Sequence, residues 1–139
     1  ARAMLSQKAR YALRALIVLA EVGEGASMMT GDLAAAAAVP RAFLERILLD
    51  LKRHGLVASR RGRSGGYGLA KPPGEIDFAA IVRAIDGPLA LAPCASRTAY
   101  RRCEDCVDVE TCAIRAALIA VRDATAAILE ARTLAGGAP

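Results

Sequence analysis

The sequence predicts a mainly α-helical fold with one small β-hairpin, a winged helix-turn-helix domain followed by a long C-terminal helix. Apolar residues recur at helical spacing along most of the 139 residues. Two short helical patterns lie close together, and a glycine-rich basic stretch between strand-like pieces follows them, in the order typical of this fold. We expect three regions: the winged helix-turn-helix at 4–87, a cysteine-rich loop at 88–111 and a closing helix at 112–134.

Two helices are expected to open the domain. Ser6 can cap the first, which carries apolar residues at helical spacing to about Val22, where glycines follow. Thr30 can cap a short alanine-rich second helix over residues 32–38. Pro40 then ends the second helix, because proline cannot continue the hydrogen-bond ladder, and it suits the first turn of the next helix.

A third helix and a hairpin complete the winged domain. The helix is expected to close at Gly55, with an apolar face made of Phe43, Leu44, Ile47, Leu48 and Leu51. Residues 56–60 and 67–69 are predicted to be short strands, joined by a basic glycine-rich tip at 61–66.

Positive charge is concentrated in this part of the chain. The whole sequence has a net charge of +5, whereas residues 41–71 carry eight basic residues and only two acidic ones. A solvated surface mixes the two signs, and a concentrated basic field favours a polyanion. Because the architecture is that of a DNA reader, we predict double-stranded DNA as the partner.

The predicted DNA contacts follow from the fold. The first turn of the second helix of a helix-turn-helix faces base edges, where arginine suits guanine and glutamate suits the amino group of cytosine. Arginines of the hairpin can reach phosphates or a minor groove, and glycines there let the backbone come close. The predicted DNA-binding residues are Arg41, Ala42, Glu45, Arg46, Arg60, Arg61, Arg63, Gly65 and Tyr67.

Two further helices are expected. Asp77 can cap a short one that turns Phe78, Ile81, Val82 and Ile85 inward, and Thr111 can cap a long one that runs to about Arg132. The long helix has an apolar stripe that must be covered, either by its own domain or by the same helix of a second copy. Because so short a chain offers little surface to cover this stripe, we expect a homodimer through Ile114, Leu118, Val121, Thr125, Ile128 and Leu129.

All four cysteines of the chain lie within nineteen residues, with the spacing C-x8-C-x2-C-x5-C. No segment reaches the roughly 18–20 apolar residues that span a bilayer, and no leader pattern is visible, so we expect a cytoplasmic protein without a membrane role. Clustered thiols in such a protein indicate metal binding or redox chemistry. The spacing by itself leaves zinc and an iron–sulfur cluster open as occupants of Cys94, Cys103, Cys106 and Cys112.

Several motifs resemble those of the iron–sulfur winged-helix regulators of the IscR, NsrR and RirA type. They are the segments 4–6 and 10–14, the segment LERIL at 44–48, GLV at 55–57 and the hairpin motif RGRSGGY at 61–67, and the resemblance covers residues 4 to about 134. It implies a homodimeric transcription factor that reads a palindromic operator and holds an iron–sulfur cluster, [2Fe-2S] or [4Fe-4S]. Three cysteines typically bind the cluster, and Cys94, Cys106 and Cys112 match them.

The chain departs from that family at the fourth ligand. Some members have a histidine three residues after the last cysteine and others an acidic residue before the tyrosine of the first helix, but this chain has Arg115 and Arg10 there. Arginine cannot fill either role, so we expect Cys103 to be the fourth ligand within one subunit.

We therefore expect a transcriptional regulator, acting as a repressor, whose operator affinity depends on an iron–sulfur cluster or on cysteine redox state. The alternatives are a zinc-stabilised or disulfide-switch regulator without an iron–sulfur cluster. An enzyme is not expected, because the C-x2-C pair at 103–106 lies outside a βαβ pattern and has no base beside it.

Overall fold

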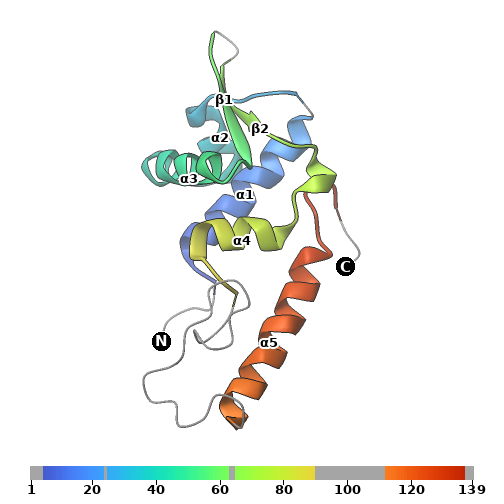
Figure 1. Cartoon of the computed structure of the whole chain (residues 1–139). Helices are drawn as coiled ribbons and strands as arrows, with labels where there is room; N and C mark the ends of the chain where they lie inside the picture. The colour runs from blue at the N-terminus through green and yellow to red at the C-terminus, as the bar shows by residue number, and fades with distance from the viewer. Residues whose placement is uncertain (1–4, 24, 63–64, 90–111, 137–139) are drawn as a thin grey trace.

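The structure, a computed structural model, describes residues 5–23, 25–62, 65–89 and 112–136. The first three helices, the hairpin and α4 form one body, from which α5 extends (Figure 1). The predicted mainly helical fold with one antiparallel hairpin is confirmed. The elements are α1 (Gln7–Val22), α2 (Thr30–Ala37), α3 (Arg41–Arg53), β1 (Val57–Arg60), β2 (Gly66–Leu69), the short 3₁₀ helix η1 (Pro73–Glu75), α4 (Phe78–Asp86) and α5 (Ala113–Glu130).

The first helix begins as predicted, and the second begins earlier than predicted. The Ser6 side chain accepts a hydrogen bond from the backbone N–H of Ala9 at 3.0 Å. The expectation that Thr30 caps the second helix is wrong, because Thr30 is its first residue and Met29 is the N-cap. The preceding Met28 is held by two backbone hydrogen bonds to Tyr67, so the chain is already positioned to enter the helix at Thr30.

The third helix packs its predicted apolar residues inward, with one exception. Leu44, Ile47, Leu48 and Leu51 are all buried. The expectation for Phe43 is wrong: this side chain is 58% exposed, because it lies on the flank of α3 beside α1 rather than on the core face. Its ring stands 6.3 Å from that of Tyr11 on α1, between ring centroids.

The hairpin has the predicted antiparallel pairing, which runs from Val57 opposite Leu69 to Arg60 opposite Gly66. A third stretch of chain joins it, because Met28 forms an isolated antiparallel bridge with Tyr67. This close approach explains the glycines of β2. A Cβ atom at Gly66 would lie 1.9 Å from the carbonyl oxygen of Met28, and one at Gly68 would lie 2.4 Å from that of Ala26.

The last two helices are joined to each other near their ends. Asp77 caps α4 as predicted, accepting from the N–H of Ala80 at 2.8 Å. The N-cap of α5 is Cys112, not Thr111 as predicted. Arg83 of α4 and Glu130 of α5 form an ion pair at 2.9 Å, and Ala126 of α5 is buried. In the described part of the chain, no helix is long and apolar enough to cross a membrane.

Candidate nucleic-acid interface and cysteine site

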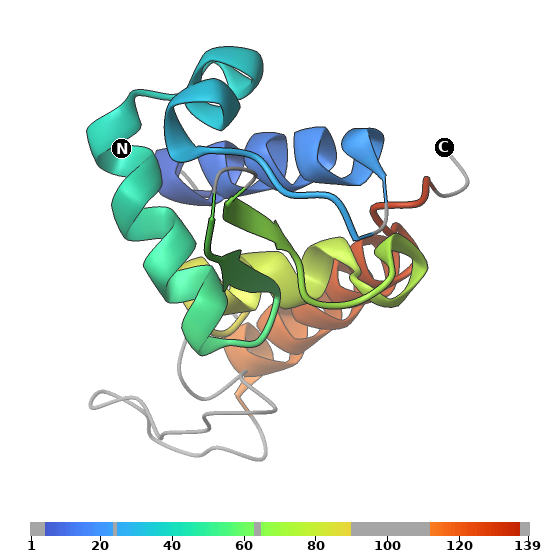
Figure 2. The same ribbon diagram turned by 90° about the horizontal axis from the view of Figure 1, so that it is seen from above.

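The third helix presents one face to solvent along its whole length. Seen from above, α3 lies at the outer edge of the body with α1 and the hairpin on its inner side (Figure 2). The four residues predicted to face bases, Arg41, Ala42, Glu45 and Arg46, are all exposed on its first two turns. Burial of the opposite face holds the helix against the core, so the exposed side chains project from a fixed backbone.

Arg41 and Glu45 form an ion pair on this face, with Nε and Oε1 3.4 Å apart. Both side chains are largely exposed, and such a pair one helical turn apart contributes only about 0.2–0.5 kcal/mol. The pair can therefore open for a partner at little cost. Arg46 has no ion-pair partner among the described residues, which leaves its charge available.

Two exposed residues further along α3 were missed by the sequence reasoning. Leu49 is 49% exposed although it is a large apolar side chain, and Arg53 is exposed one turn later. Ala42, Arg46, Leu49 and Arg53 follow one another at spacings of four, three and four residues, so they lie on one strip of the helix. That spacing is visible in the sequence and could have extended the predicted surface beyond the first turn.

The hairpin residues divide into exposed and structural ones. Arg60 and Arg61 are exposed, whereas Arg63 lies outside the described residues. Gly65 is buried, and its N–H donates to the carbonyl oxygen of Gly62 at 2.9 Å. The Tyr67 ring is partly buried against the core. The sequence therefore predicted the hairpin correctly but could not separate its exposed residues from those that shape the turn.

Each flank of α3 borders a hollow. On the hairpin side, a hollow of about 510 Å³ lies between α2, the start of α3 and the hairpin, and its lining includes Arg41, Arg60, Asp32 and glycine backbone. On the other side, a hollow of about 710 Å³ separates α3 from the start of α1.

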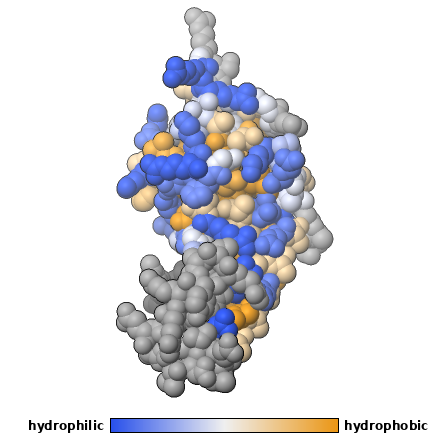
Figure 3. Space-filling model, in the orientation of Figure 1, coloured by the Kyte–Doolittle hydropathy of each residue, from blue (hydrophilic) through white to orange (hydrophobic). Residues whose placement is uncertain are grey.

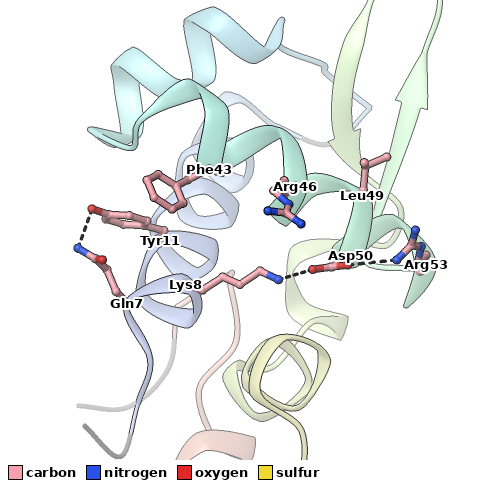
Figure 4. A pocket seen from close by; sticks show the side chains of 8 residues that line it. All are labelled: Gln7, Lys8, Tyr11, Phe43, Arg46, Leu49, Asp50 and Arg53. Carbon is pink, nitrogen blue, oxygen red and sulfur yellow. Dashed lines mark hydrogen bonds and ion pairs between the residues drawn. The ribbon is translucent and has the colours of Figure 1, made fainter. Parts of the chain in front are cut away.

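The larger hollow contains a linked set of charges (Figure 4). Lys8 Nζ lies 2.5 Å from one carboxylate oxygen of Asp50, and Arg53 lies 3.4 Å from the other. The hydrogen bond from Lys8 lowers the pKa of Asp50, burial opposes that effect, and the charges of Lys8, Arg53 and His54 reinforce it. With Arg46 the hollow holds three basic residues and one acidic residue.

Only one of the four predicted cysteine ligands lies within the described part of the chain. Cys112 is half-buried at the start of α5, where its Sγ accepts a hydrogen bond from the N–H of Arg115 at 3.4 Å. Cys94, Cys103 and Cys106 lie outside the described residues. Within them, no three histidine, cysteine or acidic side chains gather as a metal site would require.

The solvent side of α5 is almost entirely apolar. Ile114 and Ile128 are 71% and 61% exposed, and Val121 is exposed between them. Leu118, Thr125 and Leu129, also predicted at a dimer interface, are half-buried. Orange and pale-orange atoms mark part of this helix at the lower right of Figure 3. The remaining exposed residues of α5 are Ala113, Ala116, Ala117, Ala120, Ala124, Ala127 and Glu130.

Comparison with known proteins gives a consistent result. Residues 5–136 match the model of the Rrf2 family, described as iron-dependent transcriptional regulators. A putative HTH-type, rrf2-like regulator of Rhodobacter capsulatus is 48% identical over 115 residues, 81% of this chain and 77% of that protein. The regulator NsrR of Geobacillus kaustophilus is 34% identical over 131 residues, 94% and 86% of the two chains. The structure of CymR, the global cysteine regulator of B. subtilis, superposes with a TM-score of 0.73 at 29% identity, covering 94% and 92%.

Proposed function

Because this chain belongs to the Rrf2 family of transcriptional regulators, we propose that it is a cytoplasmic homodimeric repressor that reads a palindromic operator under the control of an iron–sulfur cluster. The observation that carries the DNA-reading part is the exposed strip of α3 beside the basic hairpin. Membership of a regulator family makes the chain a DNA-binding protein rather than an enzyme.

In this proposal α3 enters the major groove. Arg41 and Arg46 contact guanine edges and Glu45 accepts from a cytosine amine, while Ala42 allows close approach. Arg60, Arg61 and Arg63 of the hairpin contact phosphates or the adjacent minor groove. Gly65 and Tyr67 contribute through the shape of the hairpin, since Tyr67 is held by backbone hydrogen bonds to Met28.

The dimer forms through α5. Ile114, Ala117, Val121, Ala124 and Ile128 are exposed and follow one another at alternating spacings of three and four residues, the pattern by which two helices pair. The alanines between the larger side chains allow close approach of a second helix. Leu118, Thr125 and Leu129 border this strip and complete the interface. Two-fold symmetry then places two α3 helices on two half-sites, which is why the operator is expected to be palindromic.

The cysteine segment would hold the cluster through Cys94, Cys103, Cys106 and Cys112. The donor set fits: all four donors are thiols, which suit iron–sulfur clusters, and Cys112 Sγ already accepts a backbone N–H at the positive end of α5. When bound, the group supplies sensitivity to oxidation and to iron supply. Cys103 is needed as a ligand because Arg115 and Arg10 occupy the other positions at which relatives place a fourth ligand.

Two contacts connect the cysteine segment with α3. Asp86, just before that segment, accepts a hydrogen bond from the N–H of Ser6 at 3.0 Å and a second from its hydroxyl group. Two residues further along the chain, Lys8 in the first turn of α1 pairs with Asp50 on α3. A cluster that fixes residues 88–111 would therefore bias the start of α1 and, through it, the position of α3.

The DNA-reading proposal is tested by duplex binding over a range of salt concentrations. We expect affinity to fall steeply with salt, because each phosphate contact contributes about 0.9 to the slope of log affinity against log salt. The variant Arg46→Ala should lose affinity for its selected sequence by about 1–3 kcal/mol, with Arg10→Ala, an exposed residue of α1 outside the proposed contacts, as the matched control. Equal binding by both variants would contradict the proposal.

A zinc-stabilised or disulfide-switch regulator is the alternative, and the similarity to a cysteine regulator gives the latter some weight. The absorbance spectrum and metal content of anaerobically purified protein distinguish an iron–sulfur cluster, a zinc site and a thiol switch. A visible chromophore with bound iron and sulfide supports the cluster. A colourless protein with bound zinc supports a zinc site, and a colourless metal-free protein supports a thiol switch.

A further inference from the structure

The 710 Å³ hollow between α1 and α3 is not explained by the predicted DNA contacts. Its lining includes Lys8 and Tyr11 from α1, and neither was among the predicted DNA-binding residues. From its position and chemistry we propose that this hollow holds one sugar-phosphate strand of the DNA whose major groove α3 enters. The inference rests on the proposed placement of α3 in that groove.

The charge of the hollow suits a phosphate chain. Lys8, Arg46 and Arg53 line it and only Asp50 opposes them, so the net charge is +2. Lys8 and Arg53 already neutralise the carboxylate, which would otherwise repel a phosphate. The Lys8 ammonium group has three donors and uses one on Asp50, so two remain for phosphate oxygens.

Tyr11 adds a donor in a fixed position. Its hydroxyl oxygen accepts a hydrogen bond from Gln7 Nε2 at 2.9 Å, so its own proton is available for another acceptor. The ring is held between the Arg14 guanidinium, 5.6 Å from its centroid, and the tilted Phe43 ring. Figure 4 shows Tyr11 of α1 beside Phe43 of α3 and Lys8 extended towards Asp50, with Gln7 bonded to the Tyr11 hydroxyl group.

The apolar part of the lining also suits a nucleotide strand. Phe43 and Leu49 are both about half exposed, although large apolar side chains are ordinarily buried. A sugar-phosphate strand presents deoxyribose carbons between its phosphates, and a neighbouring base edge can present a thymine methyl group. A free inorganic anion offers nothing to these two side chains, so the observations favour the DNA strand.

The two hollows are related by their position on α3. Arg41 and Arg60 line the one on the hairpin side, and Lys8 and Arg46 line the one on the α1 side. A major groove is bounded by two sugar-phosphate strands, so a helix lying in it has one strand on each flank. The hollow beside α1 takes the strand that the hairpin does not reach.

The test uses the full chain and a random-sequence duplex of about three helical turns, which reports backbone contacts without base readout. Lys8→Gln should reduce the slope of log affinity against log salt by about 0.9. Tyr11→Phe, which keeps the ring and the net charge, should weaken binding by about threefold to tenfold with an unchanged slope. Arg10→Gln is the matched control: it removes the same charge from an exposed position of the same helix outside the hollow, and its slope should stay within about 0.3 of the wild type.

The inference is overturned if Lys8→Gln and Arg10→Gln change the slope equally, or if Tyr11→Phe binds like the wild type. It is also overturned if inorganic phosphate raises the melting temperature of the wild type but not of Lys8→Gln while both bind the duplex equally, because the occupant is then a free anion. If the wild type itself fails to bind the duplex at low salt, the proposed placement of α3 fails as well. That result distinguishes failure of the proposed function from failure of the inference about the hollow alone.

Discussion

Gly66 lies at the point where the hairpin meets the chain before α2. Its φ of 125° is one that side-chain-bearing residues rarely adopt, and a Cβ atom there would overlap the carbonyl oxygen of Met28. The two hydrogen bonds between Met28 and Tyr67 depend on that close approach. Gly66 thus links the conformation of the hairpin to the position at which α2 begins.

The variant Gly66→Ala should lower the free energy of unfolding by about 3 kcal/mol or more. Backbone strain contributes about 1–2 kcal/mol, and each disturbed hydrogen bond adds about 1 kcal/mol. Gly62→Ala is the control, since Gly62 also has a positive φ, 102°, but nothing lies within 4 Å of its Cβ position. Chemical denaturation of both variants measures the difference. Equal losses would show that close packing at Gly66 is unimportant.

Asp50 makes the stability of the helix pair α1 and α3 dependent on pH. Its pKa is lowered in the folded protein, chiefly by the hydrogen bond from Lys8, so its contribution is present above the unfolded-state value of about 3.9. That contribution is lost as the pH falls through the lower, folded-state pKa. The stability difference between the wild type and Asp50→Asn should stay constant above about pH 5 and shrink below pH 4. A difference that grows on acidification would contradict this account.

Cys103 is the residue on which single-subunit ligation depends. Cys103→Ser should cost as much bound iron as Cys106→Ser, because each removes one of four proposed ligands. The measurement is iron and sulfide content after anaerobic purification, together with the visible spectrum. A Cys103→Ser protein with a normal cluster would mean that another group supplies the fourth ligand.

At the scale of elements, α5 differs from the other helices in what its exposed side carries. On α1 and α3 the solvent side mixes charged residues with a few apolar ones, whereas all but one of the exposed residues of α5 are alanine, isoleucine or valine. Isolated exposed apolar residues are ordinary, but a continuous strip along a whole helix indicates a covered surface.

The variant Ile128→Glu should therefore shift the protein from dimer to monomer. A charge between the two paired helices would be buried without a partner, a change that costs several kcal/mol. Ala127→Glu introduces the same charge one residue away, off the strip, and should remain dimeric. Sedimentation velocity on both variants and the wild type gives the result. A wild type that is monomeric at micromolar concentration would contradict the interface itself.

Local patterns in the sequence predicted most of the elements, because helical spacing, capping residues and glycine-rich turns act over a few neighbouring residues. Ser6, Asp77 and Gly55 occupy the predicted end positions for that reason. The exposure of Phe43 depends on α1, and the position of Thr30 depends on a bridge to the hairpin some forty residues later. Such contacts between distant segments leave no periodic signal, so the hollow beside α1 was also invisible in the sequence.

For the molecule as a whole, the contacts form a continuous connection from the cysteine segment to α3. Ser6, the N-cap of α1, bonds to Asp86, and Lys8 in the first turn of α1 pairs with Asp50 of α3. The end of α5 returns to the body, where the N–H of Phe78 donates to the carbonyl oxygen of Arg132. A structural change at either end of residues 88–111 would therefore reach a helix, α4 or α5, that is attached to the body carrying α3.

The central claim, control of DNA binding by the cysteine segment, is tested most directly by one comparison. The duplex that the protein selects from a random-sequence pool is titrated with the cluster-loaded and the cluster-free protein under the same anaerobic conditions. The account predicts affinities that differ by about fivefold or more, the lower end of ordinary allosteric coupling. Equal affinities for the two forms would contradict it.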